Sequence, residues 1–134
     1  MAEYKKADLI IANNVYAHVP EINDFTIGLK KILKINGTIT LEFPHLLNLV
    51  KYNLFDTVYH EHYSYLSLYT VNKIFLEHGL KIYDVEKIST HGGSLRIYGC
   101  HKDDTKKITE KVNLILNEEK SEGLLDIRSY EKLQ

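Results

Sequence analysis

A continuous aliphatic run, Leu9-Ile10-Ile11-Ala12, constrains the fold of this 134-residue chain more than any other feature. The run has the length of a strand, does not alternate with polar residues, and ends at Asn13-Asn14. This pattern is typical of a parallel strand that is buried on both faces. We therefore expect a layered α/β fold in which both faces of this strand are covered.

A helix and a second strand follow. After Pro20, apolar residues recur at three- and four-residue intervals until Asn36-Gly37, which predicts an amphipathic helix with a glycine terminator; they are Ile22, Phe25, Leu29, Ile32 and Leu33. The alternation over 38–43, ending at Pro44, predicts a strand. A strand, a helix and a strand in this order build parallel sheets.

The second half of the chain predicts a helix, a hairpin and a last helix. Ser67 is a suitable cap for a helix that ends at His78-Gly79, with an apolar stripe of Leu68, Val71, Ile74 and Phe75. Two strands are predicted next, over Leu80–Glu86 and Ser94–Cys100, and the glycine-containing stretch between them favours antiparallel pairing. A third stripe lies on a charged helix, at Ile108, Val112, Ile115 and Leu116. This order is typical of the second half of a doubly wound α/β sheet.

Composition excludes several classes of protein and site. The 17 basic and 18 acidic side chains argue against a basic surface for nucleic acid. No apolar run is long enough for a membrane span, and residues 1–6 lack a secretion signal, so we expect a cytoplasmic protein. The single cysteine, Cys100, permits no intrachain disulfide, and no CxxC pair is present to hold zinc. The seven glycines form no GxGxxG or GxxxxGK loop.

The stretch DTVYHEHYSY, residues 56–65, permits three interpretations. His60 and His62 would share one face of an extended segment, but a catalytic metal usually needs a third ligand, so a metal site is disfavoured. An acid–base site fits better, because imidazole titrates near neutral pH and Glu61 can orient it. A polar loop whose tyrosines pack on the following helix explains the residue types about equally well.

Further polar residues lie where strands end. Asn13, Asn14 and His18 follow the first predicted strand, and His45 follows the second, at the edge where ligands of open α/β sheets bind. A lone histidine there is more often a surface or satisfied residue than a catalyst. In the last strand, Ser94, Arg96 and Tyr98 share a face and follow a glycine pair.

Four stretches give the chain a specific resemblance: residues 12–20, 42–46, 55–67 and 90–96, of which the third is the longest and most specific. Together they resemble the nucleotide-sugar C-methyltransferases that use S-adenosylmethionine, over roughly residues 8–130. The resemblance implies the second half of a Rossmann-like class I methyltransferase sheet with a closing antiparallel β-hairpin, followed by C-terminal helices. Members of that family are longer, with an amino-terminal zinc-binding region and a carboxyl-terminal α/β domain.

The resemblance therefore implies a fragment. Residues 1–103 correspond to the carboxyl-terminal half of the methyltransferase domain, and residues 104–134 to a linker helix and the start of a truncated domain. His62 is implied as the base, Glu61 and Tyr59 as its partners and His18 as a second imidazole, with a nucleotide-linked keto-sugar as substrate and no metal. Asn13 and Asn14 would border the methionine end of S-adenosylmethionine, which this chain alone would bind weakly or not at all.

Three further expectations concern strand order, function and association. We expect the strand order first, second, fourth, third, with the last strand inserted antiparallel between its neighbours. A non-catalytic α/β module that associates with itself or with a partner is the alternative to an enzyme fragment. An unpaired edge at Leu9–Ala12 predicts a homo-oligomer, formed across that edge or by exchange of the helix over Thr105–Glu119.

Overall fold

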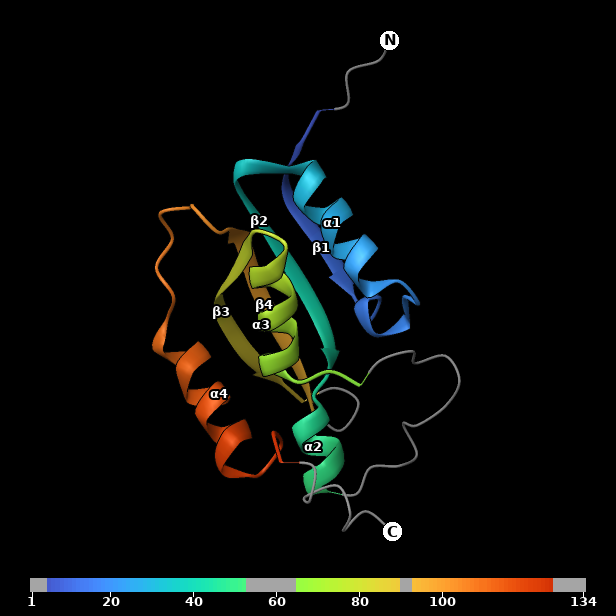
Figure 1. Ribbon diagram of the computed structural model, residues 1–134, viewed down its shortest axis with the longest axis vertical. Helices are drawn as coiled ribbons and strands as arrows, with labels where there is room; N and C mark the ends of the chain where they lie inside the picture. Colours follow the sequence, from blue (N-terminus) through green and yellow to red (C-terminus); the bar gives the residue numbers. More distant parts are fainter. Residues whose placement is uncertain (1–4, 53–64, 90–92, 127–134) are drawn as a thin grey trace.

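The computed structural model describes residues 5–52, 65–89 and 93–126. Its centre is a four-stranded sheet in the order β1-β2-β4-β3 (Figure 1). β1 (Ala7–Asn13) runs parallel to β2 (Leu33–Pro44), and β4 (Ser94–His101) lies antiparallel between β2 and β3 (Leu80–Ile88). The predicted strand order and the antiparallel insertion of the last strand are both confirmed.

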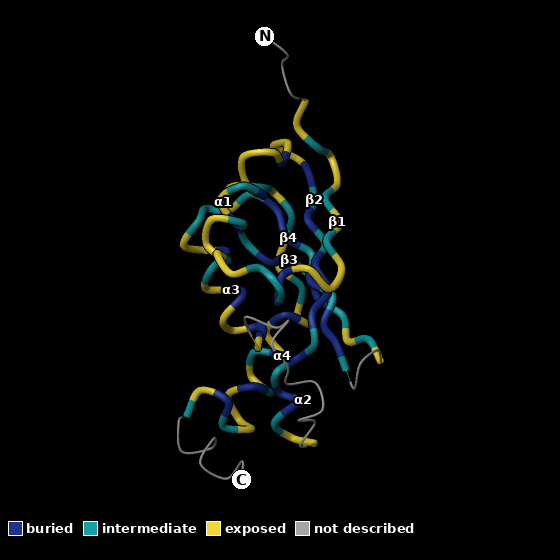
Figure 2. The backbone as a smooth tube through the Cα atoms, turned by 90° about the vertical axis from the view of Figure 1, so that its right-hand side faces the viewer, coloured by how far each residue is buried: buried dark blue, intermediate teal, exposed yellow. Residues whose placement is uncertain are grey.

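Helices pack against this sheet. α1 (Ile22–Ile32) and α3 (Leu68–Glu77) lie on the same face, as the side view in Figure 2 shows. α4 (Glu110–Ser121) packs beside α3 and β3, and the short α2 (Leu46–Lys51) follows β2. A single turn of 3-10 helix, η1 (Tyr16–His18), follows β1. None of the helices in the described part of the chain is long and apolar enough to cross a membrane.

The core lies between the sheet and the helices α1 and α3. Each strand contributes alternate side chains to it, and those of β2 and β4 include Ile39, Leu41, Phe43, Leu95 and Ile97. Gly99 occupies the same face of β4, where a Cβ would lie 2.5 Å from Cε2 of Phe75. Glycine in this strand therefore lets the Phe75 ring of α3 reach the backbone of the sheet.

The expected burial of both faces of β1 is wrong for the described chain. Ile10 and Ala12 pack on the core, whereas Leu9 is 54% exposed and Ile11 is 62% exposed. Side chains alternate between the two faces of a strand, and α1 and α3 cover only the face of Ile10 and Ala12. The continuous apolar run therefore leaves two large side chains on an uncovered face.

The helix after Pro20 ends earlier than predicted. α1 stops at Ile32, and β2 begins directly at Leu33, which pairs with Ala7 of β1. Gly37 lies inside β2 and is not a helix terminator. A Cβ there would lie 2.6 Å from Cδ1 of Leu33 and 3.0 Å from the carbonyl oxygen of Ala7. Close packing between the strands therefore requires this glycine.

The ends of α3 are confirmed and the start of α4 is not. Oγ of Ser67 accepts a hydrogen bond from the N–H of Thr70 at 3.1 Å, and Gly79 has a φ of 78°, the left-handed conformation that commonly ends a helix. α4 begins at Glu110, not at Thr105. Before it, Thr109 is extended and donates its N–H to the carbonyl of Tyr83 at 2.8 Å, so β3 holds this segment out of the helix.

Candidate functional site

The carboxyl ends of the two parallel strands meet at Asn13 and Asn14. Asn13 pairs with Glu42 in the register of the sheet, and the N–H of Asn14 donates to the carbonyl oxygen of Glu42 at 2.9 Å. Asn14 has a φ of 58°, a conformation that asparagine tolerates better than most residues, and here the chain leaves the sheet. Both asparagine side chains are exposed at this edge, where open α/β sheets bind ligands.

Tyr16 anchors the turn that carries His18. Its side chain is fully buried, and its hydroxyl donates to Oγ1 of Thr26 at 2.5 Å, which in turn donates to the carbonyl of Ile22 at 2.7 Å. Burial raises the pKa of Tyr16 to about 12, against a smaller opposing effect of its hydrogen bond with Thr26. Tyr16 is therefore a core residue, and it holds the half-buried His18 close to the end of β1.

A polar network lies on the sheet face opposite the core. Nε and Nη2 of Arg96 donate to Oε2 of Glu42 at 3.0 and 2.8 Å, and Nη1 donates to Oε1 of Glu86 at 2.9 Å. The hydroxyl of Tyr98 donates to the same oxygen of Glu86 at 2.5 Å. The predicted shared face of Arg96 and Tyr98 is confirmed.

These contacts change three pKa values. The hydrogen bonds from Arg96 to Glu42, and then to Glu86, raise the pKa of Arg96. The hydrogen bond from Tyr98 has the largest effect on Glu86 and lowers its pKa, and the bond from Arg96 lowers it further. The same bond to Glu86 raises the pKa of Tyr98. The network therefore favours the ionised form of Glu86, and it includes Glu42, the register partner of Asn13.

The other histidine at a strand end, His45, is buried. Its Nε2 lies 2.6 Å from Oε2 of Glu119, and the two side chains are 1% and 0% exposed. Glu119 does not stand out in the sequence because it lies in a charged stretch. Its spacing from Val112 and Ile115, however, places it on the buried face of α4, and that periodicity is the signal that could have identified it.

The motif residues Tyr59, His60, Glu61 and His62 lie outside the described residues, so their approach to His18 stays a prediction. The chain on both sides of this stretch is described. α2 begins directly after His45, and the N–H of Leu46 donates to the carbonyl of Leu66 at 2.9 Å. The described chain before the motif is thus α2, which follows β2, and the described chain after it contacts Leu46 beside the carboxyl end of β2.

Within the ranges that the structure describes, no three histidine, cysteine, aspartate or glutamate side chains cluster as metal ligands would. His60 and His62 fall outside these ranges, so the metal interpretation of the motif stays untested. Asn13 and Asn14 present side-chain amides that can both donate and accept hydrogen bonds at the strand end. Their expected place beside the methionine end of S-adenosylmethionine stays a prediction.

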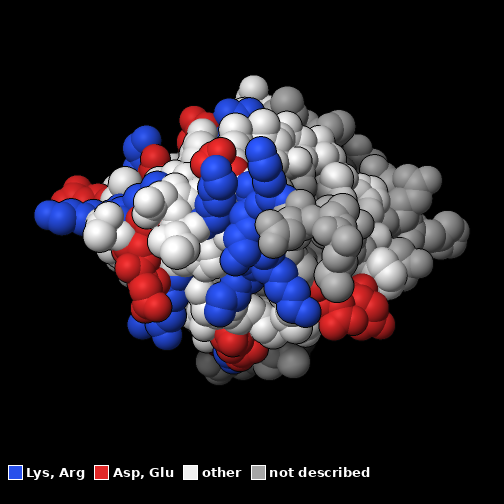
Figure 3. All heavy atoms as spheres, turned by 90° about the horizontal axis from the view of Figure 1, so that it is seen from above, with Lys and Arg blue, Asp and Glu red and all other residues white. Residues whose placement is uncertain are grey.

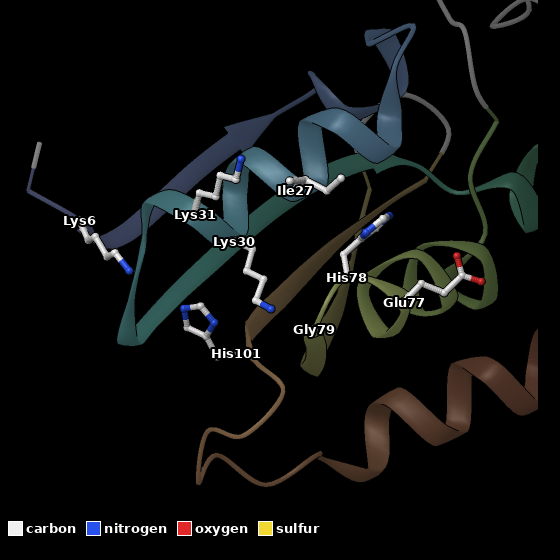
Figure 4. Close-up of a pocket in the computed structure, with 8 residues that line it drawn as sticks. All are labelled: Lys6, Ile27, Lys30, Lys31, Glu77, His78, Gly79 and His101. Atoms are coloured by element: carbon white, nitrogen blue, oxygen red, sulfur yellow. The ribbon is translucent and has the colours of Figure 1, made fainter.

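A basic pocket of about 570 Å³ lies at the opposite end of β1 (Figure 4). Its lining is Lys6, Ile27, Lys30, Lys31, Glu77, His78, Gly79 and His101. Lysine side chains also gather on this end of the molecule in Figure 3. α1 and α3 both end here, and cations stabilise the partial negative charge of helix carboxyl termini. The helix ends therefore account for the basic lining, and we assign no site to this pocket.

Two sequence comparisons decide the family. Residues 89–134 match the family described as the C-methyltransferase C-terminal domain. Over 124 residues the chain is 34% identical to the C-methyltransferase NovU of Streptomyces niveus, covering 92% of this chain. The chain belongs to the C-methyltransferase family. It spans 30% of the length of NovU, and the recognition made from the sequence motifs is confirmed.

Solved structures agree on the fold of this C-methyltransferase chain. A Haloferax volcanii complex of a methyltransferase with its activator matches at a TM-score of 0.61 and 12% identity, over 75% of this chain and 56% of the other. Magnesium protoporphyrin IX methyltransferase from Synechocystis matches at a TM-score of 0.55 and 17% identity, over 74% of this chain and 47% of the other. The N-methyltransferase NodS from Bradyrhizobium japonicum matches at a TM-score of 0.53 and 15% identity, over 77% of this chain and 55% of the other. The sheet is therefore that of a Rossmann-like methyltransferase.

Proposed function

We propose that this chain supplies part of the active site of an S-adenosylmethionine-dependent C-methyltransferase that acts on a nucleotide-linked keto-sugar. One observation carries the proposal. Asn13, Asn14 and the turn of His18 lie at the carboxyl end of β1, and Leu66, which follows residues 53–64, is hydrogen-bonded beside the carboxyl end of the neighbouring β2. The name of the relative NovU supports methyl transfer to carbon.

Methyl transfer to a carbon beside a carbonyl requires a base for the carbon-bound proton and a donor to the enolate oxygen. We assign the base to His62, because imidazole titrates near neutral pH. Glu61 orients this ring and balances its charge, Tyr59 donates to the developing oxyanion, and His18 contacts the sugar as a second imidazole. The bound cofactor supplies the methyl group as an electrophile. These roles rest on the resemblance of the motif.

This chain holds only a small part of the proposed cofactor site. Asn13 and Asn14 would contact the methionine end, and no glycine-rich phosphate or adenosine loop occurs in the sequence. We therefore propose that the chain alone binds S-adenosylmethionine weakly or not at all, and that the intact cytoplasmic enzyme needs the parts that correspond to the rest of NovU.

An exposed apolar patch favours a second property, self-association. Leu9 and Ile11 are more than half exposed, and in the described part of the chain β1 pairs only with β2. An edge strand with exposed backbone donors and acceptors tends to pair with another edge. We propose that the chain forms a homo-oligomer across β1. A non-catalytic module that associates in this way is the alternative to the enzyme fragment.

Substitution in the full-length relative NovU tests the enzymatic proposal. Changing the histidine that aligns with His62 to asparagine removes the proposed base, so methyl transfer by NovU should fall by about 100-fold or more, on the order of the usual contribution of a general base. The matched control is the histidine that aligns with His60, which should tolerate asparagine. Equal activity of the two variants, with both folded by circular dichroism, would refute the assignment.

A further inference from the structure

A buried ionisable pair joins parts of the chain that are far apart in sequence. Oε2 of Glu119 lies 2.6 Å from Nε2 of His45 and accepts from the N–H of Leu68 at 2.7 Å, and Oε1 accepts from the N–H of Tyr69 at 2.9 Å. Leu68 and Tyr69 are the first two residues of α3. One side chain of α4 therefore holds the end of β2 and the start of α3 together.

The donors around Glu119 suit a carboxylate that accepts from all of them. An ionised carboxylate only accepts, and its two oxygens have room for all three N–H groups. The amino terminus of α3 favours a negative charge, and His45 completes the solvation that burial removes. Nε2 of His45 must then carry a proton. Nδ1 of His45 is buried and has no hydrogen-bond partner among the described residues.

His45 stands at a junction of the main chain. Its N–H donates to the carbonyl of Gly93, the residue before β4, at 3.1 Å, and it forms a bridge with Leu66. α2 starts at the next residue. A contact between α4 and His45 therefore fixes β2, α2, α3 and the approach to β4 relative to one another.

Two other ion pairs attach α4 to the same region, and both are exposed. Glu118 pairs with Lys87 at 2.8 Å, and Glu122 pairs with Lys51 at 3.7 Å. Exposed pairs are weak because water screens them and ordered side chains lose entropy. The buried contact of Glu119 is the one with the geometry to hold the helix in place.

We propose that His45 and Glu119 form a buried clamp that couples the position of α4 to the strand end that carries the candidate site. α4 lies within residues 89–134, which match the carboxyl-terminal domain of the family. The clamp thus joins that part of the chain to the carboxyl end of β2. It goes beyond the proposed methyl transfer and does not depend on it.

Two substitutions of His45 distinguish the contributions of its two ring nitrogens. Glutamine places an amide N–H where Nε2 lies and can still donate to Glu119, whereas asparagine reaches only the position of Nδ1. In hydrogen exchange followed by NMR on the 134-residue chain, His45→Gln should keep the amides of Leu68 and Tyr69 protected. His45→Asn and Glu119→Gln should lower their protection by about 10-fold or more, the range of a hydrogen bond to a charged group. Glu118→Gln is the matched control and should change it little.

Loss of protection in His45→Gln with retention in His45→Asn would overturn the clamp, as would equal effects of Glu118→Gln and Glu119→Gln. The ring of the unsubstituted protein gives a second test that does not depend on whether a variant folds. Its ¹⁵N spectrum at neutral pH should show a proton on Nε2 of His45. A bare Nε2 would overturn the proposal, whatever the result of the methyl-transfer assay.

Discussion

The backbone nitrogen of Asn14 lies 2.9 Å from the carbonyl oxygen of Glu42, so the residue that follows β1 is hydrogen-bonded to the neighbouring strand. The side chain of the same Glu42 accepts two hydrogen bonds from Arg96 of β4. Glu42 therefore binds the backbone of the candidate site through its carbonyl oxygen and the guanidinium of Arg96 through its side chain. This relationship makes the Arg96 network the support of the strand end.

Removing Arg96 should destabilise the chain. Arg96→Met leaves the largely buried carboxylate of Glu42 without its charged partner, which should lower the free energy of unfolding by about 1–3 kcal/mol. Urea denaturation measures this change. Lys34→Met, which breaks the exposed pair with Asp8, is the matched control and should cost no more than about 1 kcal/mol. A similar loss in both variants would show that the network adds nothing beyond a surface pair.

Two glycine substitutions should change the stability of the fold in opposite directions. Gly99→Ala places a Cβ against the Phe75 ring and should destabilise by about 1–3 kcal/mol, the usual cost of overpacking. Gly28→Ala lies in α1 with nothing within 4 Å of the new Cβ, and should stabilise by up to about 1 kcal/mol because alanine is the better helix former. Denaturation midpoints compare the two. A stabilising Gly99→Ala would contradict the packing of α3 on the sheet.

Alkaline pH should destabilise the fold through Tyr16. Burial raises its pKa from 10.0 to about 12, so the folded state favours the neutral phenol. The corresponding stability is complete below pH 10 and is lost as the pH rises from 10 to about 12. Chemical denaturation across this range, compared with Tyr16→Phe, isolates the effect, because phenylalanine does not titrate. The exposed Tyr52→Phe should leave the alkaline loss unchanged.

Charge on the exposed face of β1 should weaken self-association. Ile11→Lys introduces a cation into the apolar patch and should shift the chain toward the monomer in sedimentation velocity. Leu114→Lys, at an equally exposed apolar position on α4, is the control and should leave the assembly unchanged. A stable monomer at high concentration in the unsubstituted chain would refute association across this edge.

The sequence predicted those parts of the fold that local chemistry determines. The Ser67 cap, the end of α3 at Gly79 and the antiparallel β3–β4 pair all follow from residues within or next to the element. The end of α1 was predicted wrongly because Gly37 is required by the close approach of β1. That contact is between two strands, so no local sequence pattern indicates it.

The candidate site was predicted in the same uneven way. Asn13, Asn14 and His18 were recognisable because they follow a strand, and the structure places them at its carboxyl end. The partnership of His45 with Glu119 spans 74 residues and depends on how α4 packs, so no motif shows it. The exposure of Leu9 and Ile11 likewise depends on which helices cover the sheet.

Titration of the ¹⁵N-labelled chain with S-adenosylmethionine, followed by amide chemical shifts, tests most directly whether the strand end is part of a methyltransferase site. We predict weak binding, with shifts that centre on Asn13 and Asn14 and appear only at high cofactor concentration. Shifts centred on the basic pocket around Lys30, or micromolar affinity for this chain alone, would contradict the proposal.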